Sequence, residues 1–170
     1  MAELRMVSLE AQPIARDAWA PFGWLPRADT DPDDGRDTLH YEWGDAHLNV
    51  IAHLPGEVEH TAEGLVCAGV YRHVTHTQAL MAMNCDAVLV VAPAGHDFSD
   101  GRGVAAVRAF HVVPQQVFVL GQGTWHWGPF PLGTQPVELL NVQGRRYAED
   151  NEYADFAALT GAVIEVVRPA

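Results

Sequence analysis

Residues 46 to 54 read Ala-His-Leu-Asn-Val-Ile-Ala-His-Leu, and this stretch is the strongest indication of the fold class. The side chains from Leu48 to Leu54 at even positions are apolar, whereas those from His47 to His53 at odd positions are mostly polar. Alternation with a period of two is typical of a β-strand that has one apolar and one mostly polar face. Pro55 and Gly56 follow directly and end the predicted strand.

Short apolar runs separated by turn residues continue through the rest of the chain. Many short strands at fairly regular spacing favour a sandwich or barrel over alternating strands and helices. We therefore expect an all-β protein with one or two short helices. The predicted strands are 87–92, 104–113, 117–120, 137–142 and 163–167, and the predicted helical segments are 14–22 and 152–159, the second with Asp150 or Asn151 as N-cap.

The length and composition indicate one ordinary globular domain over residues 1–170. A chain of 170 residues with 48% hydrophobic residues is long and apolar enough to bury a core. No apolar run has the roughly 18 to 20 residues that cross a bilayer. Residues 27–37 contain five aspartates and are expected to form an exposed loop.

The charge pattern excludes several classes of partner and chemistry. A formal net charge of −12 without a basic cluster argues against nucleic acid and anionic membrane surfaces as partners. All ten basic residues are arginines, so the chain has no lysine for a Schiff base, for lysine-linked pyridoxal phosphate or for a P-loop. Any bound anion must therefore be held by an arginine or by backbone N–H groups.

The two cysteines, Cys67 and Cys85, are expected to be buried thiols. The first residues mix acidic and basic side chains and contain no long apolar segment, unlike a secretory signal. These observations together predict a cytoplasmic protein.

Two segments combine histidine with aromatic and hydrogen-bonding residues, with glycines inside the second and Gly69 just before the first, and both are candidates for a site. They are 71–80, Tyr-Arg-His-Val-Thr-His-Thr-Gln-Ala-Leu, and 121–130, Gly-Gln-Gly-Thr-Trp-His-Trp-Gly-Pro-Phe. Imidazole transfers protons near neutral pH and binds divalent transition metals. His73 and Gln78 on one strand and His126 on a distant strand are predicted to converge inside the barrel.

These segments resemble the two motifs of the cupins. Tyr71, His73, Gln78 and Cys85 fall at the positions of the first cupin motif, with three substitutions, and His126 lies in a glycine-rich turn like that of the second motif. The resemblance implies a cupin-like double-stranded β-helix barrel.

Within the cupins, the chain is most similar to the ureidoglycolate lyase family. The similar segments follow the family order over most of the chain, and they are Ala20–Gly23, Arg72–Leu80, Val107–Phe110, Trp125–Gly128 and Asp150–Asn151. Two positions depart from the family pattern, because Tyr71 stands where an acidic residue is usual and Trp127 where a second histidine is usual.

The family resemblance implies cleavage of ureidoglycolate to glyoxylate and urea, a step of allantoin and purine breakdown. For this reaction we expect His73 or His126 to be the base and the other to be the proton donor, with Gln78 as the orienting group. Arg72 or Arg108 is the candidate clamp for the carboxylate of a small substrate, because guanidinium pairs with carboxylate through two parallel hydrogen bonds.

The remaining assignments concern the pocket wall and a metal. Tyr71 and Trp127 are candidate substrate-binding residues, while His76 is expected to face solvent. Some family members use a divalent ion such as nickel, so nickel or zinc bound by His73 and His126 is a further expectation.

Three alternatives remain open from the sequence. One is a different cupin enzyme that acts on another small hydroxy or keto acid, and another is an amidohydrolase that releases ammonia from ureidoglycolate. The third is a catalytically inactive barrel that binds a small ligand as a dimer. A homodimer is expected in any case, because small barrels often pair through edge strands and two-fold dimers are the commonest oligomers.

Overall fold

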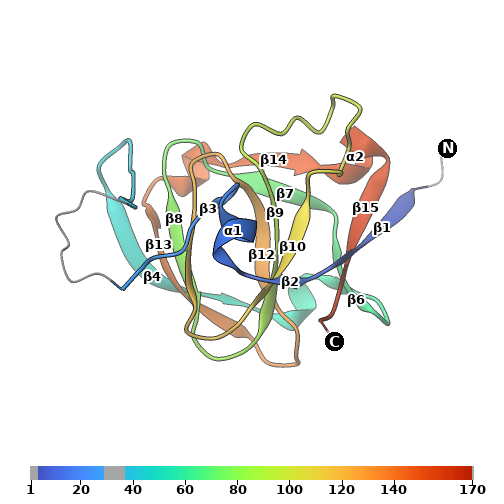
Figure 1. The fold of residues 1–170 in the computed structure, drawn as a ribbon, viewed down its shortest axis with the longest axis horizontal. Helices are drawn as coiled ribbons and strands as arrows, with labels where there is room; N and C mark the ends of the chain where they lie inside the picture. The colour runs from blue at the N-terminus through green and yellow to red at the C-terminus, as the bar shows by residue number, and fades with distance from the viewer. Residues whose placement is uncertain (1–3, 29–36, 170) are drawn as a thin grey trace.

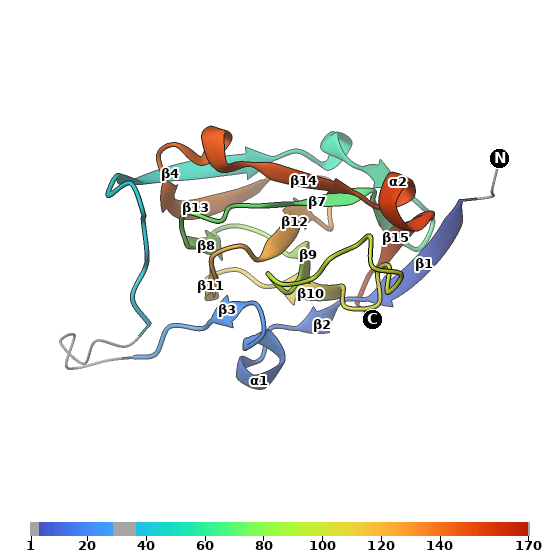
Figure 2. The same ribbon diagram turned by 90° about the horizontal axis from the view of Figure 1, so that it is seen from above.

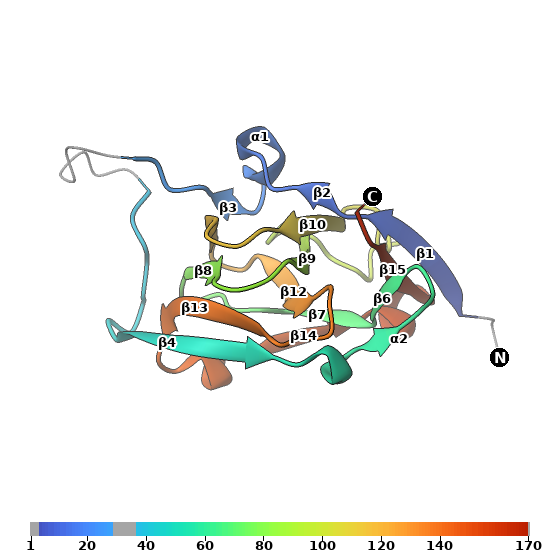
Figure 3. The same cartoon turned by 90° about the horizontal axis from the view of Figure 1, so that it is seen from below.

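The structure is a computed structural model that describes residues 4–28 and 37–169. It confirms the predicted all-β class, with three sheets and two short α-helices (Figure 1). Two of the sheets face each other, and the chain passes back and forth between them as in the expected cupin-like barrel (Figures 2 and 3).

The two facing sheets form the barrel. The six-stranded sheet has the order β14-β7-β12-β9-β10-β2, and the five-stranded sheet has the order β3-β11-β8-β13-β4. The strands of the first are β2 (Gln12–Pro13), β7 (Gly69–Arg72), β9 (Ala87–Ala92), β10 (Arg108–Val112), β12 (Trp125–Pro131) and β14 (Glu152–Asp155). Those of the second are β3 (Gly23–Trp24), β4 (Ala46–His53), β8 (Gln78–Ala82), β11 (Val117–Leu120) and β13 (Val137–Gly144).

A third sheet covers one end of the molecule, beside both chain termini (Figure 1). Its order is β1-β15-β6-β5, with β1 and β15 parallel. The strands are β1 (Arg5–Glu10), β5 (Glu59–His60), β6 (Gly64–Cys67) and β15 (Ala162–Val167), and the helical segments of the chain are α1 (Arg16–Trp19), η2 (Pro55–Glu57), η3 (Tyr147–Asp150) and α2 (Phe156–Thr160). None of the helices in the described ranges has the length and apolar character that a membrane crossing requires.

Two apolar cores hold these sheets together. One contains side chains from both barrel sheets, among them Leu89, Phe110 and Phe118, and fills one end of the barrel. The other contains side chains from the third sheet and from the six-stranded sheet, such as Leu65 and Val90. Some of these core side chains, among them Leu80 and Leu139, also line the cavity described below.

Three sequence predictions need correction. The strand predicted at 104–113 begins only at Arg108, because residues 104–107 form turns. The helix predicted at 152–159 is wrong over its first part, where β14 pairs with β7, and α2 begins after Asp155, whose carboxylate caps the Ala158 N–H at 3.0 Å. Cys67 is buried as expected and Cys85 is partly exposed, and both are free thiols. Most of the acidic loop predicted at 27–37 lies outside the described residues.

Strand β4 confirms the predicted alternation, and its mostly polar face is the one turned toward the cavity. Asn49, Ile51 and His53 line the cavity, whereas Leu48 and Val50 are 65% and 54% exposed on the outside. Among the strands of the described residues β4 pairs only with β13, which makes it an edge strand there. Apolar side chains on an exposed edge are compatible with the expected homodimer, which stays a prediction.

Candidate functional site

A cavity of about 360 Å³ is lined by residues of both barrel sheets. Strand β7 leads into His73, β8 begins with Gln78, and His126 lies in β12, opposite Tyr71 of β7. All four of these residues line the cavity, so segments far apart in the sequence meet there as predicted.

Three imidazole rings lie together beside this cavity, and two of them, those of His73 and His126, line it. The ring centroids of His73 and His126 are 5.3 Å apart, and those of His73 and His76 are 4.8 Å apart in a stacked arrangement. His76 was predicted to face solvent, and this prediction is wrong because its side chain is only 3% exposed. A smaller hollow is lined by the three histidines and Gln78.

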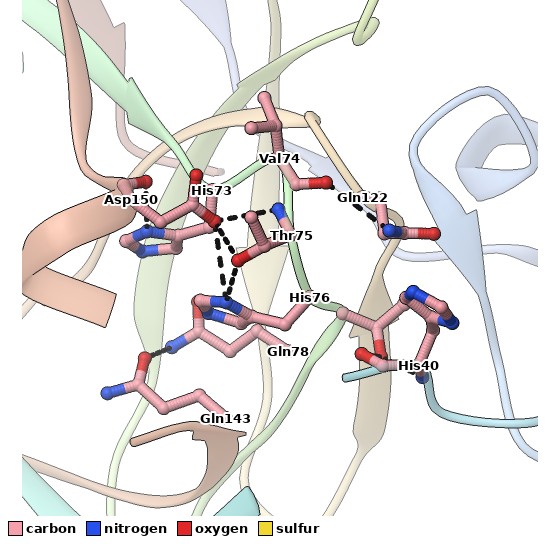
Figure 4. Close-up of polar contacts among 10 residues, drawn as sticks. His40, His73, Val74, Thr75, His76, Gln78, Gln122, Gln143 and Asp150 are labelled. Atoms are coloured by element: carbon pink, nitrogen blue, oxygen red, sulfur yellow. Dashed lines mark hydrogen bonds and ion pairs between the residues drawn. The ribbon is translucent and has the colours of Figure 1, made fainter. Parts of the chain in front are cut away.

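Asp150 of η3 holds two of these rings in place (Figure 4). Its carbonyl oxygen accepts a hydrogen bond from His73 Nδ1 at 3.1 Å, and its carboxylate lies 3.6 Å from His76 Nδ1. The same carboxylate accepts hydrogen bonds from the backbone N–H, at 2.7 Å, and from the hydroxyl of Thr75. Burial alone would raise the pKa of the Asp150 carboxyl, but the Thr75 hydrogen bonds and His76 lower the pKa below its usual range.

The hydrogen bonds also fix which nitrogen carries the proton in the rings of His73 and His126. His126 Nδ1 is 3.0 Å from the Thr124 carbonyl oxygen, and His73 Nδ1 faces the Asp150 carbonyl. A carbonyl only accepts, so Nδ1 must be the protonated nitrogen in both rings. In the neutral rings the lone pair is therefore on Nε2, which makes His73 and His126 two bases of the same kind.

All three rings are neutral near pH 7. Burial, with smaller contributions from the neighbouring His73 and His76, lowers the pKa of His126 to about 4. Burial and the neighbouring His73 together lower the pKa of His76 to about 4, although the Asp150 carboxylate opposes the shift. The pKa of His73 is lowered too, again mainly by burial. The cluster can therefore accept a proton, but it contains no imidazolium that could act as an acid until one ring has accepted a proton.

The lowered pKa values predict that stability depends on pH. Between about pH 6.5 and pH 4 the unfolded chain binds more protons at His76 and His126 than the folded chain does. We expect the free energy of unfolding to be largest above about pH 6.5 and to decrease as the pH falls toward 4. The loss for each histidine is about 1.4 kcal/mol for every unit by which folding lowers its pKa. Guanidinium chloride unfolding at several pH values measures this slope. His126→Gln should make the dependence of the unfolding free energy on pH shallower. An unchanged dependence would contradict a lowered pKa for His126.

A row of neutral amides forms one wall of the cavity. Gln78 Nε2 donates to Asn141 Oδ1 at 2.8 Å and to Gln143 Oε1 at 3.0 Å, and Asn141 Nδ2 donates to Asn49 Oδ1 at 2.7 Å. Two buried polar atoms beside this row, Gln78 Oε1 and His76 Nε2, have no hydrogen-bond partner in the described part of the chain. A buried acceptor without a partner is unfavourable unless a ligand or a water satisfies it, so the wall is suited to bind a polar group.

The opposite part of the cavity is aromatic and apolar. Trp127 and Phe130 lie on either side of a register shift in β12, with ring centroids 4.5 Å apart, and both line the cavity with Tyr71. The ring of His53 lies 4.7 Å from that of Phe130, and His53 Nδ1 is 2.9 Å from a Glu57 carboxylate oxygen. The predicted wall residues Tyr71 and Trp127 thus lie at the cavity.

The structure does not bring the two predicted arginines to the histidines. The Arg72 guanidinium contacts the Glu152 carboxylate at 2.6 Å, donates to the Ala94 carbonyl and lies 4.3 Å above the Trp125 ring. Arg108 donates to the carbonyls of Ala105 and Val107. Neither lines the cavity, and both make the local contacts expected of structural arginines.

The His76 ring occupies the space that a side chain at Gly144 would need, and this close packing gives a second prediction. A Cβ atom at Gly144 would lie 2.9 Å from His76 Nδ1, and the ring cannot move away without leaving its stack on His73. We expect Gly144→Ala to lower the free energy of unfolding by about 1–3 kcal/mol. Gly133→Ala is the matched control, since a Cβ there meets open space. Equal effects of the two substitutions in guanidinium chloride unfolding would contradict this packing.

The expected metal does not fit the residues as they are placed. Within residues 4–28 and 37–169, no group of three or more His, Cys, Asp or Glu side chains is arranged to hold a metal ion. His73 and His126 alone supply two nitrogens, fewer than a stable site needs. We therefore derive no step through a metal, and nickel or zinc stays a prediction.

Comparison with known proteins supplies the family. The model of the family described as ureidoglycolate lyase matches residues 36–163. A solved dTDP sugar isomerase from Desulfovibrio desulfuricans G20 is 16% identical, with 79% of this chain and 80% of that chain covered and a TM-score of 0.45. A comparison with curated proteins found no match.

Proposed function

Because the chain belongs to the ureidoglycolate lyase family, we propose that it eliminates urea from ureidoglycolate and leaves glyoxylate. The observation that supports this proposal is the pair of neutral rings, His73 and His126, which line a cavity of about 360 Å³. The substrate carbon carries a hydroxyl group and a urea nitrogen, and the reaction requires a proton to move from one to the other.

Because the rings are neutral at the start, one ring carries out both proton transfers: it first removes the hydroxyl proton and then donates a proton to the departing nitrogen. Nε2 of His73 or His126 removes the hydroxyl proton, the C=O bond forms, the C–N bond breaks, and the departing nitrogen takes up a proton. The ring that accepted the hydroxyl proton is then an imidazolium and is the nearest donor for that nitrogen. No water is consumed and no net proton is released, so the second ring need only accept a hydrogen bond from the substrate.

The amide wall is suited to the urea end. Gln78 Oε1 is a buried acceptor beside the rings, and both hydrogens of its amide nitrogen are used by Asn141 and Gln143. A urea N–H group would satisfy this acceptor and orient the leaving nitrogen toward the imidazoles. Gln78 therefore has an orienting role in the proposal.

The test is an assay of purified protein with ureidoglycolate that reads glyoxylate, urea and ammonia together. The proposal expects glyoxylate and urea in equal amounts, without ammonia, and the same rate after treatment with a chelator. Ammonia in place of urea would identify an amidohydrolase, and loss of activity with chelator would identify a metal enzyme. No product above the uncatalysed rate would contradict the proposal and favour the inactive ligand-binding barrel.

A further inference from the structure

The row of amides in the cavity wall has a direction. Three carboxamides are joined head to tail, because Gln78 Nε2 donates to Asn141 Oδ1 and Asn141 Nδ2 donates to Asn49 Oδ1. The second hydrogen of Gln78 Nε2 starts a branch that ends at Gln143 Oε1 (Figure 4). Every hydrogen bond of the row therefore points away from Gln78, and the oxygen of each following amide is an occupied acceptor.

The strand register produces this arrangement. Asn49 of β4 lies directly opposite Asn141 of β13, and Gln143 follows two residues later on the same face of β13. Asn49, Gln78 and Gln143 line the cavity. The row thus runs along the cavity wall from Gln78 in β8, across β13, to β4.

The two ends of the row differ chemically. At the first end, Gln78 Oε1 is a buried acceptor without a hydrogen-bond partner in the described part of the chain. At the other end, the oxygens of Asn49 and Gln143 are occupied, and no hydrogen bond within residues 4–28 and 37–169 uses the hydrogens of their NH2 groups. Hydrogen bonds in such a row polarise one another, which strengthens the last donors. One end of the row accepts, and the other end only donates.

Groups that only donate are suited to an anion. A carboxylate only accepts hydrogen bonds, and bonds to a charged acceptor are stronger than those between neutral groups. Ureidoglycolate carries N–H donors on its ureido group and a carboxylate on the carbon that also bears the hydroxyl. When a ureido N–H binds Gln78 Oε1, the carboxylate can lie toward Asn49 and Gln143, so the substrate and the row have complementary ends.

We therefore propose that the NH2 groups of Asn49 and Gln143 bind the carboxylate of the substrate, which makes these two residues the determinants of specificity for an acid. This inference rests on the proposed function and deepens it, because it assigns a binding partner to the part of the substrate that does not react. Two neutral amides thus take the role that the sequence prediction gave to Arg72 or Arg108.

Two stable ureas that lack the reacting hydroxyl test this assignment. N-carbamoylglycine carries a carboxylate, N-carbamoylglycinamide carries an uncharged carboxamide of nearly the same size, and isothermal titration calorimetry gives the Kd of each for the full chain. Asn49→Ala removes the donors. Asn49→Asp keeps an acceptor for Asn141 but replaces the NH2 group by a charged oxygen.

The expected result is a selective loss of the acid. N-carbamoylglycine should bind about ten-fold more weakly to Asn49→Ala and at least about 100-fold more weakly to Asn49→Asp, because the latter adds repulsion between like charges. N-carbamoylglycinamide should weaken by no more than about three-fold in either variant. Gln143→Glu makes the same replacement at the second donor group and should show the same selectivity.

Asn84→Asp is the matched control, because it adds the same charge outside the cavity, where Asn84 contacts the backbone of Pro136 and Glu138. It should change neither Kd by more than about two-fold, since a distant solvated charge contributes little. Thermal unfolding of each variant verifies that it is folded.

The outcomes separate this inference from the proposed function. An unchanged Kd of N-carbamoylglycine in the folded variants, an equal loss of both ureas, or no binding of N-carbamoylglycine to the parent protein overturns the inference. Urea release from ureidoglycolate by the same preparation would then leave the function standing. Selective loss of N-carbamoylglycine supports the inference. If the same preparation releases no urea, the reaction is wrong and the carboxylate site remains.

Discussion

Replacing His126 by alanine is expected to lower kcat/KM for urea release by about 10²–10⁴-fold, the usual contribution of a general acid–base group. His126 lies in the ring cluster, and its Nδ1 hydrogen bond to Thr124 leaves the Nε2 lone pair as the basic site of the ring. Alanine removes that lone pair and the hydrogen bond together. The measurement is urea release by the purified variant, with its thermal unfolding recorded to verify that it is folded.

His111→Ala is the matched control for this substitution. His111 lies in β10, where its ring nitrogen is 3.0 Å from the Asp86 carboxylate, and it does not line the cavity. Its removal should leave kcat/KM within a factor of about two, since exposed ion pairs contribute little. If the folded His126→Ala protein were as active as the His111→Ala protein, His126 would have no part in proton transfer.

The largest effect on stability is expected for Trp19→Ala, at about 3–5 kcal/mol of lost unfolding free energy. Trp19 is fully buried, and its ring lies 5.1 Å from Phe110 and 5.3 Å from Phe118 in edge-on contacts. Its indole N–H donates to the Val119 carbonyl at 3.0 Å. The substitution therefore leaves a large cavity in the barrel core and an unsatisfied carbonyl, which guanidinium chloride unfolding will measure.

Trp43→Ala is the comparison for Trp19, because Trp43 is 37% exposed and contacts the Arg146 guanidinium on the surface. We expect a change of at most about 1 kcal/mol there. A similar loss from both substitutions would mean that the α1 segment does not close the core as described.

The strands could be predicted from the sequence because their pattern is local. The alternation of residues 46–54 and the apolar run 87–92 both became strands close to the predicted bounds. The helix predicted at 152–159 failed over its first part for a non-local reason, since residues 152–155 pair with β7, which lies far earlier in the chain. Asp155 and Gly161, the N-cap and the left-handed C-cap residue, were the local signals of the true helix.

The site could be predicted only in part for the same reason. The two histidine-containing segments, together with the family resemblance, predicted that His73, Gln78 and His126 lie together. His76 was missed because alternation was extended past Arg72, although β7 ends there and the next residues form bends. Its partner Asp150 lies in a different segment, η3, so the sequence around His76 does not indicate the contact between the two side chains. The arginines were placed by chemistry alone, which does not show which way a side chain points.

The pH dependence of kcat/KM tests most directly the central claim, that neutral buried imidazoles carry the proton. Because the pKa of His126 is about 4, kcat/KM for urea release should stay constant from about pH 8 to about pH 5.5 and fall only as the pH approaches 4. A decline centred near 6.5, the ordinary pKa of histidine, would contradict the account, because the working base would then be a solvated imidazole outside this cluster.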